Sequence, residues 1–283
     1  MYAAFGKQPG VWSVVAKHKH LTWHAGKVAL AAAGVISLLF LALPLLALLL
    51  RGLATFDLAR IPASGIPNAV SLSVVTTLIT ALLTLLLGTP LAFILARWRF
   101  PAKHVVNVLV ELPIVLPPAV AGLALLVAFG RRGLLGPALE SLGVTLPFTT
   151  AAVIVAQTFV SAPFYVRSAI VGLQSVPREL EDAARVDGAA GFTLFWYVTL
   201  PLARLSLYAG LVLSWARALG EFGATILFAG SFQGRTQTMP LLVYNVLESD
   251  INAAIWTGLL LVAMALAALF VSQWLMRRAT SEH

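Results

Sequence analysis

The sequence predicts an all-α, polytopic integral membrane protein with about six transmembrane helices. Of the 283 residues, 60% are hydrophobic and only 11% are charged, and the mean hydropathy is +0.92, which is too apolar for a soluble globular domain. The apolar residues also gather in runs that are long enough to cross a bilayer. These runs lie near 27–50, 70–96, 105–129, 148–172, 202–228 and 253–275.

Residues 1–26 precede the first apolar run and are predicted to form a basic segment on the cytoplasmic side of the membrane. They include Lys7, Lys17 and Lys19 together with Trp12 and Trp23. Basic residues with interfacial aromatic residues are typical of the inner face of a membrane. The apolar run that follows is longer than the core of a signal peptide, so we expect it to remain as a helix of the mature protein.

The distribution of Lys and Arg predicts that both ends of the chain are cytoplasmic. With the N-terminus inside, most of these residues fall on inner segments, as the positive-inside rule requires. The outer loops then carry Arg51, Arg60, Arg131, Arg132 and Arg235. We therefore expect one membrane domain over residues 27–276, a short cytoplasmic tail over residues 277–283, and a cytoplasmic position for the loop between the fourth and fifth runs.

The third run contains a proline-rich stretch, ELPIVLPP, at residues 111–118. Proline removes a backbone donor and clashes with the preceding turn, so the helix should break or kink here. Broken backbone at membrane depth is tolerated where it is buried in protein or lines a water-filled cavity. Pro117 and Pro118 are therefore candidates for the wall of a translocation pathway, and a kinked helix that serves only packing is the alternative.

Residues 177–201, PRELEDAARVDGAAGFTLFWYVTLP, form a polar stretch between two apolar runs. A segment of this length and composition predicts a structured loop rather than a slack connector. Pro177 suits the first turn of a short helix, and Gly188 permits a turn at the end of that helix. Pro201 is expected to mark the start of the next long helix.

The fifth run carries two charges, Arg217 and Glu221. Their spacing of four would place them on one face of a continuous helix, where they can pair. An unpaired charge at the centre of a membrane helix costs about 2.5–3.5 kcal/mol on insertion scales, so both should face protein or water. Two alternatives remain equal for Arg217 and Glu221. They form a structural ion pair, or they line the translocation pathway together with Thr225 on the same run.

The spacing in the 177–201 loop resembles that of the EAA loop in the membrane subunits of ABC importers. The match consists of Asp182-Ala183-Ala184, three residues, Gly188, nine residues, and Val198-Thr199-Leu200-Pro201. Asp182 stands where that family carries Glu, and Glu181 precedes it. The resemblance implies a coupling helix that docks on a cytoplasmic ATPase. It assigns this contact to Glu181, Asp182, Ala183, Ala184, Gly188, Leu200 and Pro201.

Three further stretches are similar to permeases that import tetrahedral oxyanions. They are Leu112–Pro118, Arg217–Ala224 and the segment GRTQTMP at residues 234–240. This resemblance implies transport of molybdate or tungstate, with sulfate or thiosulfate as the alternative cargo. It also implies two ATPase subunits, an extracytoplasmic binding protein and a second copy of this permease as partners, all at the inner membrane of a prokaryote.

Several other functions are excluded by what the sequence lacks. It has no phosphate-binding loop of the G-x-x-x-x-G-K-[ST] type, so ATP and Mg²⁺ are expected on the partner ATPase, and we predict no enzymatic activity, catalytic residue, metal site or cofactor in this chain. The basic residues are scattered rather than clustered, which argues against nucleic-acid binding. A gradient-driven secondary transporter is the alternative class, but inverted repeats and further intramembrane carboxylates would be expected there.

Overall fold

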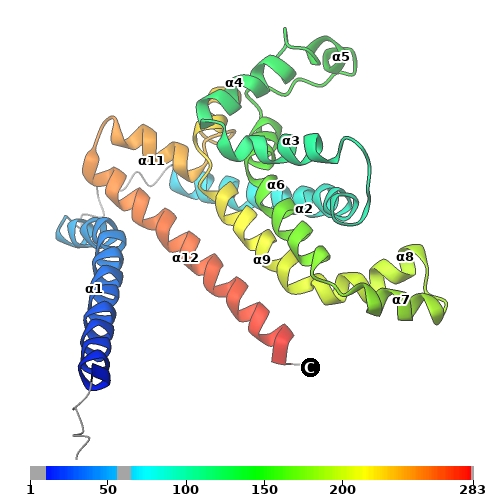
Figure 1. Ribbon diagram of the computed structural model, residues 1–283. Helices are drawn as coiled ribbons and strands as arrows, with labels where there is room; N and C mark the ends of the chain where they lie inside the picture. Colours follow the sequence, from blue (N-terminus) through cyan, green and yellow to red (C-terminus); the bar gives the residue numbers. More distant parts are fainter. Residues whose placement is uncertain (1–10, 56–64, 282–283) are drawn as a thin grey trace, which may run out of the picture. The chain divides into compact units, whose positions relative to one another are not determined.

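The computed structural model describes residues 11–55 and 65–281, and the regular elements in these ranges are all helical (Figure 1). The chain divides into two units, and the first contains α1 (Val11–Ala54). The part of α1 from Gly26 to Ala54 is apolar and long enough to cross a membrane. Because α1 begins at Val11, part of the predicted basic segment is helical, and residues 1–10 lie outside the described residues.

The second unit contains the remaining helices. In the described ranges, five helices, α1 included, are long and apolar enough to span a membrane, and a bent pair would make a sixth. This confirms the predicted fold class. The helix α12 continues to Ser281, so most of the predicted tail is helical. The helices of this unit are α2 (Ile66–Arg97), α3 (Lys103–Val115), α4 (Pro118–Phe129), α5 (Gly136–Ser141), α6 (Thr150–Gln174), α7 (Arg178–Val186), α8 (Gly191–Leu194), α9 (Leu200–Leu219), α10 (Gly223–Ala229), α11 (Met239–Leu247) and α12 (Ile251–Ser281).

The third apolar run is broken rather than straight. α3 and α4 meet at an angle of 119°, with Leu116 and Pro117 between them in extended conformations. The residue before a proline is driven out of the helical region by its ring, and here both residues of the link precede a proline. Pro118 then opens α4 from its first position, where its missing N–H does no harm.

The fifth run departs from the prediction at both ends. The expected continuous helix over 202–228 ends at Leu219 and resumes as α10 after a short turn. At the other end, α9 begins at Leu200 with Pro201 in its first turn, as predicted, but it continues directly from the preceding helical turns, so that the apolar span runs from Gly191 to Leu219. A π-helical turn over Phe195–Thr199 ends two residues before Pro201, and it widens the helix where the ring cannot be accommodated in a regular i→i−4 ladder.

The centre of the second unit is a three-helix pack of α2, α6 and α9. Its buried residues include Ala92 on α2, Tyr165 and Ala169 on α6, and Ala203 and Leu207 on α9. The alanines among these residues allow the helix backbones to approach closely, which is the usual way in which membrane helices associate.

The helices α6 and α9 approach each other closely in this pack. A Cβ atom built on Gly172 would lie 2.3 Å from Cβ of Ser206, and one built on Gly210 would lie 2.6 Å from Cβ of Ser168. The hydroxyl of Ser168 also donates to the carbonyl oxygen of Ser206 at 2.8 Å. Each glycine thus faces a serine on the other helix, and these two contacts fix the crossing of α6 and α9.

Replacement of Gly210 by alanine is therefore expected to destabilise the protein by about 1–3 kcal/mol, because Ser168 Cβ is fixed to the α6 backbone and the helices must move apart. The matched control is Gly258→Ala on α12, where nothing lies within 4 Å of the added Cβ and alanine is the better helix former. Thermal unfolding in detergent measures both variants. Equal melting temperatures for the two would contradict the proposed crossing.

Candidate functional site

The helix α7 is defined by local sequence signals at both ends. Pro177 precedes it in an extended conformation, and Glu179 and Glu181 lie in its first turn, where negative charge interacts favourably with the helix dipole. At the other end Gly188 has a φ of +91°. The N–H of Gly188 donates to the carbonyl of Arg185, and that of Ala189 to the carbonyl of Ala184. This pair of bonds is a Schellman motif, which requires the left-handed backbone that glycine adopts.

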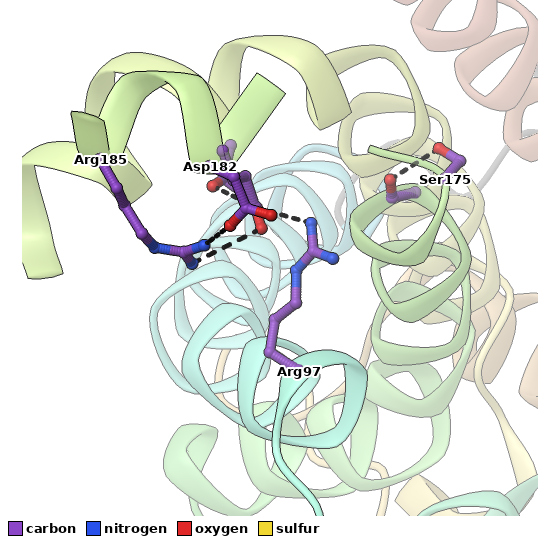
Figure 2. A network of polar contacts seen from close by, with 7 residues as sticks. Arg97, Ser175, Asp182 and Arg185 are labelled. Carbon is purple, nitrogen blue, oxygen red and sulfur yellow. Dashed lines mark hydrogen bonds and ion pairs between the residues drawn. The ribbon is translucent and has the colours of Figure 1, made fainter. Parts of the chain in front are cut away.

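Glu181 attaches α7 to the membrane-spanning helices. Its Oε1 lies 2.6 Å from Nη2 of Arg97, the last residue of α2. The hydroxyl of Thr199, in the π-helical turn, donates to the same oxygen at 2.8 Å. Figure 2 shows this network, with Arg97 and Arg185 extending toward the acidic residues from opposite sides of Asp182. Because the side chain of Glu181 is only 6% exposed, this anchor is shielded from solvent.

The neighbouring acid, Asp182, has different surroundings. Its side chain is 68% exposed, and its ion pair is with Arg185 one turn along the same helix. Ala183 is exposed and Ala184 is half-buried. Glu181 and Asp182 were predicted to have the same role, whereas the structure turns Glu181 inward and leaves Asp182 on the surface of α7.

The last two predicted coupling residues open α9. Leu200 is half-buried, and Pro201 is exposed. Two residues that the sequence reasoning missed are Arg97 and Thr199, which hold Glu181. A signal for Arg97 is present in the sequence, because it is the first charge after a long apolar run, but its partner lies 84 positions away.

A partly apolar surface surrounds this anchor. Leu180, Val186, Phe192 and Tyr197 are all exposed, and Val186 reaches 88%. A cavity of about 330 Å³ lies beside them between α7 and the end of α2, and its lining includes Arg97, Arg178 and Arg185. Exposed apolar side chains with charged neighbours are typical of a surface that binds another protein.

The second candidate site is at the break between α9 and α10. The Nη1 atom of Arg217 lies 2.7 Å from Oε2 of Glu221, so the predicted ion pair is present. The prediction that both residues share one helical face is wrong, because α9 ends at Leu219. Glu221 instead lies in the turn, where its Oε1 accepts the N–H of Ala224 at 2.8 Å. It therefore both pairs with Arg217 and caps the start of α10.

A cavity of about 110 Å³ adjoins this ion pair. Its lining combines residues of the proline break, residues of α6 and the side chain of Arg217. The side chain of Arg217 is 30% exposed, whereas that of Glu221 is only 1% exposed. A Cβ on Gly223 would lie 2.5 Å from Cβ of Pro118, so α10 packs directly on the start of α4. The lining residues are Pro113, Ile114, Leu116, Pro118, Ala121, Val160, Phe164 and Arg217.

Of the predicted pathway residues, the structure brings Pro118 and Arg217 together at this cavity. Pro117 lies at the bend and is exposed. Glu221 lies behind Arg217, and Thr225 is completely buried in α10. The arrangement offers one partly accessible guanidinium in a small cavity, and its charge is compensated by a carboxylate that is withdrawn from that cavity.

Comparison with known proteins identifies the family. Residues 88–280 match the model of the family described as "Binding-protein-dependent transport system inner membrane component". The chain is 44% identical to the molybdenum transport system permease protein ModB of Mycobacterium tuberculosis over 235 residues, which is 83% of this chain and 88% of that protein. It is 39% identical to the sulfate transport system permease protein CysW of Synechococcus elongatus over 72% of this chain and 74% of that one.

A solved structure gives the same result for the fold. The bacterial alginate ABC transporter, in complex with an alginate pentasaccharide-bound periplasmic protein, contains a chain that superposes with a TM-score of 0.75 at 17% identity, covering 95% of this chain and 98% of that one. The family match covers more than half of the sequence and includes the broken helix, α7 and the Arg217 cavity. The chain therefore belongs to the binding-protein-dependent inner membrane components, the multi-pass permease subunits of ABC importers of the molybdate and sulfate type.

Proposed function

We propose that this chain forms the translocation pathway of an importer for molybdate or tungstate, working as a homodimer with two ATPase subunits and an extracytoplasmic binding protein. The observation that carries the choice of cargo is the 44% identity to a molybdenum permease over 83% of the chain. Sulfate is the second candidate because of the 39% identity to a sulfate permease. ATP and Mg²⁺ would be bound by the ATPase, and this chain would hold no cofactor of its own.

The surface around α7 supports the proposed contact with the ATPase. Its exposed apolar residues and its fixed attachment through Glu181 suit a helix that transmits a rigid displacement. Movement of α7 would be passed to the end of α2 through Arg97 and to the π-helical turn of α9 through Thr199. This reading places α7 and both chain termini in the cytoplasm.

The cavity at Arg217 supports an anionic cargo. A guanidinium offers several N–H donors in a geometry that matches oxyanions. The bend between α3 and α4 contributes Leu116 and Pro118 to the cavity beside it. The carboxylate of Glu221 compensates part of the positive charge of Arg217, so the anion would be bound less tightly and could leave again.

Reconstituted vesicles that contain the permease, its ATPase and its binding protein test this function. We expect molybdate uptake that requires ATP and binding protein and that excess tungstate inhibits more strongly than excess sulfate. A stronger effect of sulfate would favour the sulfate alternative. Uptake driven by an ion gradient without ATP would contradict the proposal and favour a secondary transporter.

The subunit ratio is a separate measurement on the purified complex. Two identical copies of this chain with two ATPase subunits are expected by mass measurement in detergent. One copy beside a different permease would contradict the homodimer and would also weaken the assignment of molybdate.

A further inference from the structure

A second arginine–glutamate pair lies within the membrane-spanning helices, apart from Arg217 and Glu221. Nη1 of Arg167 on α6 contacts Oε1 of Glu111 on α3. Their side chains are 62% and 48% exposed in the single chain. Charged groups within a membrane span face protein or water rather than lipid. The exposed parts of the Arg167 and Glu111 side chains must therefore contact either another protein surface or water.

The pair lies in a groove of about 530 Å³, which is within the usual size of a small-molecule site. The groove is bounded by α3, α6 and α9, and apart from Ser168 the rest of its lining is apolar. The lining residues are Glu111, Ile114, Val115, Phe164, Arg167, Ser168, Val171 and Leu213.

The groove and the Arg217 cavity are neighbours along one face of α6. Val160, Phe164 and Arg167 are spaced by four and three residues, which places them on the same side of the helix. Phe164 and Ile114 line both the cavity and the groove. From Val160, the first α6 residue of the cavity lining, the helix rises by roughly 10 Å to Arg167, which lies one turn beyond Phe164 toward the end of α6 that leads to α7.

We infer that Arg167 is a second binding position for the transported oxyanion, one step nearer to α7 than Arg217, and that Phe164 and Ile114 form the constriction between the two positions. This inference rests on the proposed function. Both positions have the same construction, in which a guanidinium in an accessible space is paired with a carboxylate. An anion moving along this face would leave one arginine and reach the next after passing two apolar side chains.

The pairing explains how an anion can bind at Arg167 and still leave. A guanidinium carries five N–H donors, and the contact with Glu111 involves Nη1, so an oxyanion in the groove can engage the exposed side of the group. The carboxylate of Glu111 competes for the same charge and limits how strongly the anion is held. Glu111 is therefore a positioning residue, and Arg167 is the residue that would touch the cargo.

The two members of the pair should respond differently to neutralisation, and this asymmetry is the test. In the reconstituted vesicles with binding protein and ATPase, Arg167→Gln and the double variant Glu111→Gln/Arg167→Gln should each reduce molybdate uptake by about tenfold or more. Both should retain ATP hydrolysis that loaded binding protein stimulates. Glu111→Gln is the matched comparison, since it removes one charge from the same pair but keeps the guanidinium; the anion should still bind but leave more slowly, so the loss of uptake should be smaller than in Arg167→Gln.

Three results would overturn the inference. Near-normal uptake by the double variant would show that no anion needs Arg167. Equal losses in Glu111→Gln and Arg167→Gln would assign the pair a structural role, and so would separation of the two permease copies in the double variant, as seen by size-exclusion chromatography. Failure of the wild-type vesicles to take up molybdate, tungstate or sulfate would instead overturn the proposed function and with it this inference.

Discussion

Replacement of Glu181 by alanine is expected to abolish uptake and to lower the stability of the folded permease. The change removes the carboxylate from Arg97, whose side chain is only 11% exposed, and leaves the hydroxyl of Thr199, at 1% exposed, without its acceptor. Removing one partner of a buried pair typically costs about 3–5 kcal/mol, because the other charge stays buried and uncompensated. The end of α7 would then lose its attachment to both α2 and α9.

The matched control is Asp182→Ala, the neighbouring acid on the same helix. Its ion pair with Arg185 is exposed, and exposed pairs contribute about 0–1 kcal/mol. Thermal unfolding in detergent should therefore separate the two variants clearly. Similar melting temperatures would show that the Glu181 anchor contributes little to the fold.

A further variant separates stability from coupling. Replacing Arg97 and Glu181 together by methionine removes both charges with side chains of similar length, and such exchanges of buried pairs are often neutral or stabilising. We expect this double variant to fold but to hydrolyse ATP without transport, because α7 is no longer held in a fixed orientation. Normal uptake would mean that Glu181 serves only to neutralise Arg97.

The second large effect is expected from the double variant Arg217→Gln/Glu221→Gln. The side-chain oxygen of glutamine can still accept the N–H of Ala224, so the cap of α10 is retained, and no unpaired charge is left behind. The protein should therefore fold, but uptake should fall by about tenfold or more, since the cavity at the backbone break no longer presents a guanidinium to the anion.

Uptake and ATP hydrolysis should be measured on the same vesicles. Lost uptake with hydrolysis still stimulated by loaded binding protein would support the place of Arg217 in the pathway. Full uptake would leave the pair with a structural role alone. Glu221→Gln by itself is a weaker test than the double variant, because it leaves the charge of Arg217 without a carboxylate.

The sequence by itself determined the features that depend on local chemistry. The lengths of the apolar runs indicated a membrane protein with about six spans, and residues 11–55 and 65–281, which the structure describes, contain five helices of this kind and one bent pair. The prolines at residues 113, 117 and 118 indicated a break, since the proline ring acts on its own turn. Gly188 indicated the end of α7, because few other residues adopt a positive φ there.

The tertiary structure alone decided which side chains those elements bring together. Glu181 and Asp182 are adjacent on α7 and equally acidic, and only the position of Arg97, 84 residues earlier, selects Glu181 as the buried one. The spacing of Arg217 and Glu221 predicted their contact but for the wrong reason, since a turn and not a helix places them together.

The apolar pattern missed the π-helical turn and the bend after Leu219 for the same physical reason. A run of apolar residues reports burial or contact with lipid, and this preference is the same in a straight helix, in a π-helical turn such as Phe195–Thr199 and in the bend after Leu219. Backbone geometry at these points is set by a proline ring and by the packing of α10 on Pro118. Hydropathy carries no information about either, so the shape of the pathway depends on contacts between helices that are distant in sequence.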